Sequence, residues 1–247
     1  MTNWHEDDNF WETTASMMFR TQIWEMAPQQ IEDIMARTGL ELPFQVLDLP
    51  CGVGRHALEF ARKGCQVTGV DRTSQYLDEA RQHAKGAGLD IEFVQADMRD
   101  FSRSESYDLA INLFTSFGYF EDQADDVKVL TNFYNSLRPG GVLVMEMMGK
   151  EVLARIFKPS SWDELDDGSL ILEERKVTHN WTWVENRWIL VKDGQRHDLF
   201  LSHRVYSAAE LEHLLAVVGF ESIEFYGDLA GSLYDQDARR LVAIARR

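Results

Sequence analysis

Val46-Leu-Asp-Leu-Pro-Cys-Gly-Val-Gly-Arg-His-Ala57 is the stretch that decides the fold of this 247-residue chain. A short apolar strand at residues 44–48 leads into a turn that contains Gly52 and Gly54, and a helix follows at residues 55–63. Glycine lets the backbone adopt positive φ and approach a ligand closely, and the first turn of a helix offers unpaired N–H groups to a negative group. The stretch therefore predicts a strand–turn–helix unit at a ligand site, with a tight turn that binds nothing as the alternative. Its spacing also fits the relaxed dinucleotide pattern G-x-G-x-x-A.

Short apolar runs and amphipathic segments continue to alternate after this unit. Strands are expected at 44–48, 66–70, 91–95, 107–112 and 142–146, and helices at 55–63, 73–85 and 125–137. The strands are continuous apolar runs rather than alternating ones, which is typical of a parallel sheet covered by helices on both faces. The fold class predicted for this part of the chain is therefore α/β.

The residues before the first strand divide at Pro28. Proline is favoured in the first turn of a helix and glycine just past its end, so a helix is expected between Pro28 and Gly39. Residues 1–26 hold five bulky aromatic side chains but no long periodic element, namely Trp4, Phe10, Trp11, Phe19 and Trp24. We therefore expect these aromatic side chains to pack against the surface of another part of the protein.

The pattern changes after Gly149. A short helix is expected at 150–157, and 170–206 has the features of an antiparallel meander with a hairpin turn at Asp193-Gly194. Ser207-Ala-Ala-Glu210 is a capping box that opens a helix ending at Gly219. Two last strands are expected at 220–225 and 241–245. An antiparallel insertion of roughly sixty residues therefore interrupts the α/β domain.

Composition and charge exclude several classes of protein. Hydrophobic residues make up 45% of the chain and charged residues 27%, which are ordinary globular values and exclude a disordered or fibrous protein. Twenty-five basic against 41 acidic residues give a formal net charge of −16, which disfavours nucleic acid and anionic membranes as partners. The acidic start has no signal-peptide features, and Cys51 and Cys65 cannot form a disulfide framework, so we expect a cytoplasmic protein.

Three acidic residues follow the ends of predicted strands. Asp48 can accept a hydrogen bond from a cationic amine. Asp71, 17 residues after Gly54, can accept both hydroxyls of a ribose, or else cap the next helix. Asp97 can accept the exocyclic amine of an adenine while Met98 packs on the ring, or else form an Asx turn.

The loop at residues 112–120 leaves the fourth strand at its carboxyl end, where open α/β sheets place their ligands. Its hydroxyl groups belong to Thr115, Ser116 and Tyr119, and its phenylalanines provide apolar wall or core. No paired metal-ligand motif is present in the sequence, so no metal is expected. His56, after the glycine turn, is expected to be a packing residue.

These four stretches, in this order and followed by Leu137-Arg-Pro-Gly-Gly141, resemble the class I S-adenosylmethionine-dependent methyltransferases of the small-molecule type. The resemblance covers about residues 44–147, with Pro50 where the family has its first glycine. It implies a doubly wound, Rossmann-like sheet of seven mostly parallel strands, the last one reversed. It also implies S-adenosylmethionine as cofactor, and methyl transfer to a nitrogen or oxygen of a small molecule.

The resemblance also implies site residues. By position, it assigns cofactor binding to Asp48, Pro50, Gly52, Gly54, Asp71, Arg72, Asp97, Met98, Asn112 and Leu113. In the first segment, Arg20 is best placed to meet the cofactor's carboxylate. Ser116 and Tyr119 belong to the acceptor pocket, and Tyr119 is the catalytic candidate. Trp183, Arg204 and Tyr206 in the meander either line that pocket or pack on the main domain.

The domain organisation follows from these assignments. Residues 1–26 are expected to form a lid over the cofactor, 27–149 and 207–247 the cofactor-binding domain, and 150–206 the cover of the substrate site. Two other functions share part of this pattern. A nicotinamide-dependent oxidoreductase has the glycine turn and the ribose acid, and a non-catalytic module can bind S-adenosylmethionine without methylating anything. The sequence is compatible with a monomer or a homodimer.

Overall fold

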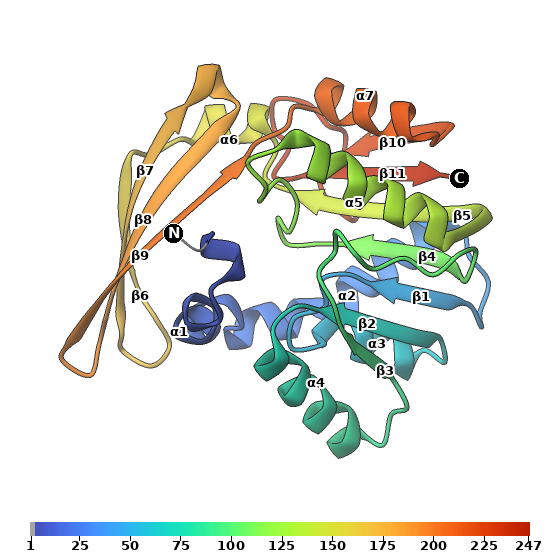
Figure 1. The fold of residues 1–247 in the computed structure, drawn as a ribbon, viewed down its shortest axis with the longest axis horizontal. Coiled ribbons are helices and arrows are strands. Elements are labelled where there is room, and N and C mark those ends of the chain that lie inside the picture. The colour runs from blue at the N-terminus through green and yellow to red at the C-terminus, as the bar shows by residue number, and fades with distance from the viewer. Residues whose placement is uncertain (1–2) are drawn as a thin grey trace.

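The computed structural model describes residues 3–247, which form two β-sheets with helices around the larger one (Figure 1). The larger sheet has seven strands in the order β10-β11-β5-β4-β1-β2-β3. Their bounds are β1 (Gln45–Asp48), β2 (Gln66–Asp71), β3 (Glu92–Gln95), β4 (Tyr107–Asn112), β5 (Leu137–Met147), β10 (Ser222–Tyr226) and β11 (Leu241–Arg246). Neighbouring strands from β3 to β5 are parallel, and β11 is antiparallel to both of its neighbours. The expected α/β fold with a reversed last strand is confirmed.

Helices cover both faces of this sheet. Their bounds are α2 (Thr21–Thr38), α3 (Arg55–Arg62), α4 (Ser74–Ala87), α5 (Gln123–Ser136) and α7 (Ala208–Val218). Because side chains along a strand alternate between its faces, Val46 packs into the core under α2 and α3, whereas Leu47 packs into the core under α5 and α7. Burial on both faces explains why these strands appear in the sequence as continuous apolar runs.

The N-terminal region differs from its prediction. A 3₁₀ turn, η1 (Trp4–Glu6), and a helix, α1 (Asp8–Met18), lie in the segment for which no regular element was expected. The expectation that Pro28 opens a helix was wrong, because Pro28 lies inside α2. Proline cannot donate a backbone hydrogen bond, but Ile31 and Ile34 of the same helix are buried against the sheet. Tertiary packing of this apolar face outweighs the local effect of the proline.

The insertion forms a separate four-stranded antiparallel sheet in the order β6-β7-β8-β9, after a short helix, α6 (Lys150–Ile156). Its strands are β6 (Ser160–Glu164), β7 (Leu170–Thr178), β8 (Trp183–Lys192) and β9 (Gln195–Arg204). The meander and its turn at Asp193-Gly194 agree with the sequence, and both turn residues have positive φ. β6 was not foreseen because this edge strand is short, polar and largely exposed.

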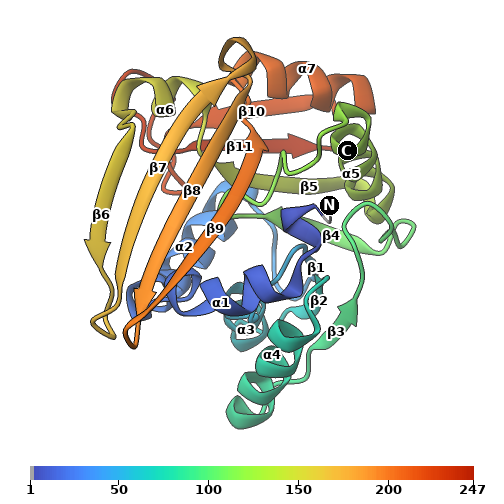
Figure 2. The same cartoon turned by 60° about the vertical axis from the view of Figure 1, so that its left-hand side comes forward.

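The two sheets enclose the N-terminal segment. Figure 1 shows the four-stranded sheet facing the edge of the larger sheet at which β4 and β5 end, with η1 and α1 between the two. Figure 2, in which the four-stranded sheet comes forward, shows α1 behind β8 and β9. The predicted capping box of Ser207 and Glu210 begins α7 and joins the insertion to the main domain. No helix within residues 3–247 is long and apolar enough to cross a lipid bilayer.

Candidate active site

A cavity of about 530 Å³ lies where the two sheets face each other. Its walls come from three parts of the chain: the loops that follow β1 to β4, the N-terminal segment, and the inner face of the four-stranded sheet. Residues that line it include Pro50, Gly52, Asp71, Arg72, Asp97, Met98, Leu113, Ser116 and Tyr119 from the loops, Trp4, His5, Trp11 and Phe19 from the N-terminal segment, and Glu173, Arg175, Asn186, Trp188 and His203 from the four-stranded sheet. Parallel sheets bind ligands at this edge.

The glycine turn after β1 is shaped by its neighbours. Gly52 has a φ of +54°, and a Cβ atom there would lie 3.0 Å from the ring of Phe19. The backbone N–H of Gly52 donates a hydrogen bond of 2.8 Å to Oδ2 of Asp71. The turn thus joins the first two strand ends, and the N-terminal segment packs directly on it.

Asp71 is buried and lines the cavity at the end of β2. Its Oδ1 accepts a hydrogen bond of 2.8 Å from the backbone N–H of Thr73, and Thr73 itself is the N-cap residue of α4. Asp71 is therefore not the exposed helix cap that was the alternative interpretation. Burial raises the pKa of its carboxyl group, although the backbone hydrogen bonds oppose the shift.

Asp97 carries an interaction that sequence reasoning did not foresee. The guanidinium of Arg99 binds both oxygens of Asp97, at 3.0 and 2.7 Å, and also reaches Oε1 of Glu6 at 2.9 Å. Burial alone would raise the pKa of Asp97, but the hydrogen bonds from Arg99 hold it below its usual value. The carboxylate is thus ionised at the cavity wall, and it is linked to the N-terminal segment through Arg99.

Three predicted cofactor residues lie beside the cavity and do not line it: Asp48, Gly54 and Asn112. Oδ2 of Asp48 and Oδ1 of Asn112 are both buried, and neither has a hydrogen-bond partner among residues 3–247. Burial raises the pKa of Asp48 to about 8, although the nearby Arg55 opposes the shift. Two buried acceptors without donors suit a cationic group bound beside them.

The loop after β4 is held by backbone and side-chain contacts on both sides. Phe114 and Thr115 both have positive φ. The backbone N–H of Phe114 donates to Glu146 at 2.8 Å, and Oγ1 of Thr115 accepts from Arg240 at 2.7 Å. Arg240 also pairs with Glu146. Contacts of this density place Ser116 and Tyr119 in fixed positions on the cavity wall.

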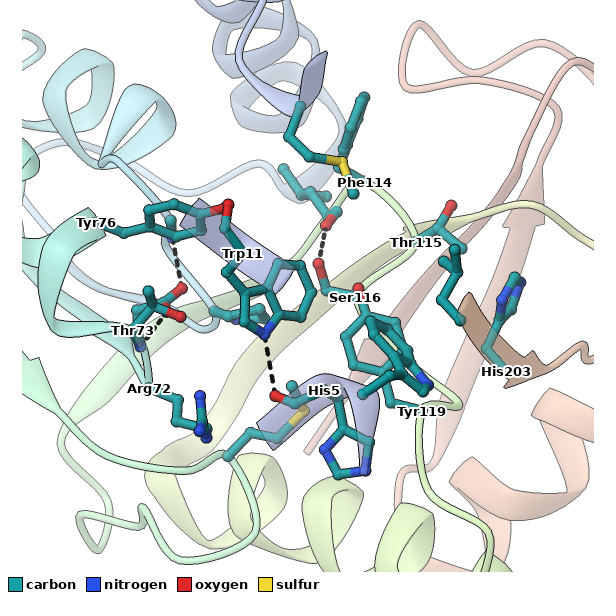
Figure 3. Close-up of a pocket in the computed structure, with 18 of the residues that line it drawn as sticks. His5, Trp11, Arg72, Thr73, Tyr76, Phe114, Thr115, Ser116, Tyr119 and His203 are labelled. Carbon is teal, nitrogen blue, oxygen red and sulfur yellow. Dashed lines mark hydrogen bonds between the residues drawn. The ribbon is translucent and has the colours of Figure 1, made fainter. Parts of the chain in front are cut away.

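Tyr119 lies among aromatic side chains of the N-terminal segment (Figure 3). Its ring centroid is 4.9 Å from that of Trp4 and 6.2 Å from that of Trp11. Burial raises the pKa of the phenol to about 12, so the hydroxyl stays protonated at neutral pH. Tyr119 can therefore orient a ligand by a hydrogen bond, but it is not a base at neutral pH.

Four further predicted residues do not line the cavity. Arg20 forms an ion pair of 2.9 Å with Asp163 of β6 and does not line the cavity. Trp183 and Arg204 are paired across β8 and β9 on the sheet face opposite to the residues that line the cavity. The hydroxyl of Tyr206, which follows β9, donates to buried Asp126 at 2.6 Å.

Arg204 and Tyr206 therefore pack on the main domain, as in the second of the two interpretations, and the ring of Trp183 lies against the guanidinium of Arg204. Arg204 and Tyr206 both bind Asp126 of α5. The cavity is lined instead by Val184, Asn186 and Trp188, which alternate with Trp183 along β8. Alternation along a strand defines two faces but does not say which of them is turned inward.

Sequence reasoning also missed Arg55, in the first turn of α3. Its guanidinium lines the cavity, lies 5.3 Å from the ring centroid of Phe114, and donates to Gln30 at 2.9 Å. Burial lowers the pKa of Arg55 to about 10, although Asp48 opposes the shift. The next residue, His56, is buried, and its Nε2 lies 3.0 Å from Gln30, in agreement with the expected packing role.

Comparisons with known proteins agree with this geometry. Residues 46–141 match the model of a family described as a methyltransferase domain. The glycine/sarcosine N-methyltransferase of Halorhodospira halochloris is 25% identical over 218 residues, which cover 82% of this chain and 75% of that protein. A ubiquinone biosynthesis O-methyltransferase of Actinobacillus pleuropneumoniae serotype 7 (strain AP76) is 31% identical over 112 residues, 44% of this chain and 48% of that protein.

The fold has a solved counterpart in an S-adenosylmethionine-dependent methyltransferase from Clostridium acetobutylicum ATCC 824. The TM-score is 0.79 at 19% identity, with 90% of this chain and 91% of that chain covered. The match at residues 46–141 identifies a methyltransferase domain, and the fold around it is that of an S-adenosylmethionine-dependent methyltransferase. It is therefore an enzyme of the transferase class, and its cofactor is S-adenosylmethionine.

Proposed function

We propose that this enzyme transfers the methyl group of S-adenosylmethionine to a nitrogen or oxygen atom of a small molecule that binds between the two sheets. The observation that carries the proposal is the shape of the cavity. One volume of about 530 Å³ extends from the loops after β1 to β4 to the inner face of the four-stranded sheet. That volume is in the range of small-molecule sites, and the N-terminal segment covers it. The N- and O-methyltransferases among the relatives support both kinds of acceptor atom.

The cofactor would lie along the strand ends. In this arrangement Asp71 accepts the ribose hydroxyls, and Asp97 and Met98 contact the adenine. Pro50, Gly52, Arg72 and Leu113 also line this side of the cavity. The unpartnered oxygens of Asp48 and Asn112 suit the positive charge of the methionine end of the cofactor.

We infer that Arg55, rather than Arg20, meets the carboxylate of the cofactor. Arg20 is engaged with Asp163 outside the cavity. Arg55 lines the cavity and is only 5% exposed, so a bound anion would stabilise its buried charge. Gln30 and the carbonyl oxygen of Ile23 hold the guanidinium in place, at 2.9 and 3.3 Å.

The bound cofactor supplies a methyl group already activated by the positive sulfur. The remaining task of the protein is to hold the acceptor atom in line with that methyl group and to exclude water. Orientation of this kind contributes up to about 7–11 kcal/mol. Ser116 and Tyr119 are the loop residues assigned to the acceptor side, and Tyr119 would orient the acceptor by a hydrogen bond.

We also propose that residues 1–26 act as a lid; residues 1 and 2 of this range lie outside the described part of the chain. The segment is attached to both sides of the cavity. The indole N–H of Trp4 donates to the carbonyl oxygen of Ser202 on β9 at 2.8 Å, and Arg72 pairs with Asp8 at 2.7 Å. Release of these contacts would open the cavity for exchange of cofactor and acceptor.

Calorimetry and a product assay test the proposed function. We expect S-adenosylmethionine and S-adenosylhomocysteine to bind and NAD not to bind measurably. Binding of NAD without S-adenosylhomocysteine would instead support the oxidoreductase. Tight binding of S-adenosylmethionine with no methylated product from any small amine or hydroxyl compound would support the non-catalytic module.

A further inference from the structure

The inner face of the four-stranded sheet turns two polar side chains, Asn186 and His203, toward the cavity, and the buried indole N–H of Trp188 lies on the same face without a hydrogen-bond partner among residues 3–247. Asn186 on β8 is only 9% exposed, and its side chain has no hydrogen-bond partner among residues 3–247. His203 on β9 lines the same cavity and is likewise without a hydrogen-bond partner in that part of the chain. Polar side chains that line a cavity and are not paired within the protein are available to hydrogen-bond a bound molecule.

The register of the strands brings these two side chains together. Val184 pairs with His203, and Asn186 pairs with Leu201, so Asn186 and His203 are diagonal neighbours on one face. Diagonal neighbours in an antiparallel pair lie about 7–8 Å apart, within reach of one small group held between them. Figure 3 draws His203 among the side chains that line the same cavity as Thr115, Ser116 and Tyr119.

The charged residues around this pair are already neutralised. On β7, Glu173 and Arg175 form an ion pair of 2.5 Å, and Ser161 bonds to both of them at 2.8 Å. On the opposite side, Arg240 pairs with Glu146. Burial lowers the pKa of His203 to about 4, so its imidazole is neutral at physiological pH. The acceptor end of the cavity therefore offers hydrogen bonds without a free charge.

We propose that Asn186 and His203 bind a neutral amino group of the acceptor, so that the enzyme is an N-methyltransferase. This inference rests on the proposed methyl transfer and specifies its acceptor. The side-chain oxygen of Asn186 and one imidazole nitrogen of His203 accept the two N–H groups of the amine. The lone pair of the amine is then left free to point toward the methyl group.

An amine needs no base, and this cavity provides none on the acceptor side. The nitrogen lone pair forms the new N–C bond as the S–C bond breaks, and the bonding electrons of that bond stay on sulfur, which becomes a neutral thioether. The nitrogen becomes a cation and gives its extra proton to water after release. An alkyl hydroxyl would have to lose its proton during the attack. Tyr119 stays protonated, His203 is a weak base, and Glu173 is bound to Arg175.

A labelling experiment distinguishes nitrogen from oxygen. The enzyme is incubated with S-adenosylmethionine carrying a ¹³C-methyl group and a panel in which each primary amine is matched with the alcohol of the same carbon skeleton. The ¹³C chemical shift of the product separates N-methyl from O-methyl groups. We expect transfer to amines only. Transfer to the alcohols would overturn this inference and leave the methyltransferase intact, whereas no transfer to either set would count against the proposed methyl transfer itself.

Variants of His203 on β9 and of Asn186 on β8 test the proposed roles of these two residues. The substrate is the amine of that panel that is methylated most efficiently. We expect His203→Leu and Asn186→Leu each to raise KM for the amine about 10-fold, the loss expected for one hydrogen bond, with unchanged affinity for S-adenosylhomocysteine. His203→Gln keeps a hydrogen-bonding group and should recover most of the loss. Because both residues hold one amino group, the double variant should lose less than the product of the two single losses.

His197 provides the matched control, because it lies on the same face of β9 but outside the cavity lining. We expect His197→Leu to leave KM unchanged. If His203→Leu lowers the midpoint of thermal unfolding but leaves KM equal to that of His197→Leu, His203 is a structural residue and the inference is overturned.

Discussion

The backbone N–H of Arg204 donates a hydrogen bond of 2.6 Å to the carbonyl oxygen of Gly118. A Cβ atom on Gly118 would lie 2.5 Å from the carbonyl oxygen of Arg204, so the two backbones meet with no room for a side chain. This contact joins the loop after β4 to the last strand of the insertion. The wall that carries Ser116 and Tyr119 and the wall that carries His203 therefore have a common attachment.

Gly118→Ala tests this attachment. Gly118 has a φ of +92°, which alanine adopts only with strain, and the added methyl group would collide with backbone rather than with a flexible side chain. We expect a loss of unfolding free energy of about 2–4 kcal/mol, together with loss of activity, measured by chemical denaturation and methyl transfer. Gly88→Ala is the matched control, because Gly88 also has positive φ but open space around it, and it should lose only about 1 kcal/mol. Equal losses in both variants would show that the backbone contact is unimportant.

Asp71→Asn tests the ribose assignment. Gly52 and Thr73 donate to different oxygens of Asp71, so the variant keeps an acceptor for only one of these two hydrogen bonds and also loses the charge. A hydrogen bond to a charged group contributes about 1.5–3 kcal/mol, so we expect at least a 10-fold loss of affinity for S-adenosylhomocysteine by calorimetry. Asp78→Asn, an exposed acid of α4 that pairs with Arg81, should bind as the wild type does. Unchanged affinity in Asp71→Asn would remove this residue from the cofactor site.

Asp48 should make the stability of the cofactor-free enzyme depend on pH. Its pKa is about 8 in the folded chain, against a usual value of 3.8, so the folded state keeps a proton that the unfolded state has released. The free energy of unfolding should therefore fall as the pH rises from about 4 to 8, and this fall should be smaller in Asp48→Asn. Urea denaturation at a series of pH values measures the difference between the two proteins. Parallel curves would mean that Asp48 titrates normally.

The affinity for S-adenosylmethionine should rise with pH, whereas the free energy of unfolding falls. The cationic methionine end of S-adenosylmethionine favours the ionised form of Asp48, so affinity should rise with pH up to about 8 in the wild type and remain flatter in Asp48→Asn. Calorimetry in buffers of different ionisation enthalpy would detect the proton released on binding. Binding without proton release would contradict a contact between Asp48 and the cofactor.

Trp4→Ala tests the lid. The substitution removes the hydrogen bond to Ser202 and the ring contact with Tyr119, so we expect S-adenosylhomocysteine to dissociate about 10-fold faster in a stopped-flow experiment. Bound cofactor should also slow proteolysis within residues 3–26 of the wild type. Trp162→Ala, on the exposed surface of β6, is the control and should dissociate at the wild-type rate. Equal rates in both variants would rule out a lid at Trp4.

Tyr119→Phe separates an orienting role from packing. The ring and its contacts with Trp4 and Trp11 remain, and only the hydroxyl is lost. If the hydroxyl orients the acceptor in the transition state, kcat should fall about 10-fold or more with unchanged cofactor affinity. Because the phenol stays protonated at neutral pH, the remaining activity should keep the pH profile of the wild type. Wild-type turnover would leave Tyr119 as an apolar wall residue.

Much of the main domain could be predicted because its signals are local. The strand–turn–helix unit around Gly52, the turn at Asp193-Gly194 and the capping box at Ser207 each depend on residues that are neighbours in sequence. The helix through Pro28 could not be predicted in this way. It depends on the burial of Ile31 and Ile34 against strands that lie elsewhere in the chain.

The sequence by itself determined the order of elements and the acids at the strand ends, because periodicity and turn chemistry act over a few residues. Only the tertiary structure decided which side chains face the cavity. Alternation along β8 separates Trp183 from Asn186, but only the packing of the insertion on α5, through Arg204 and Asp126, turns Asn186 inward. Tertiary structure also decided that Arg55 lines the cavity and Arg20 does not. A long charged side chain finds its partner among residues distant in sequence, which are Asp163 for Arg20 and Gln30 for Arg55.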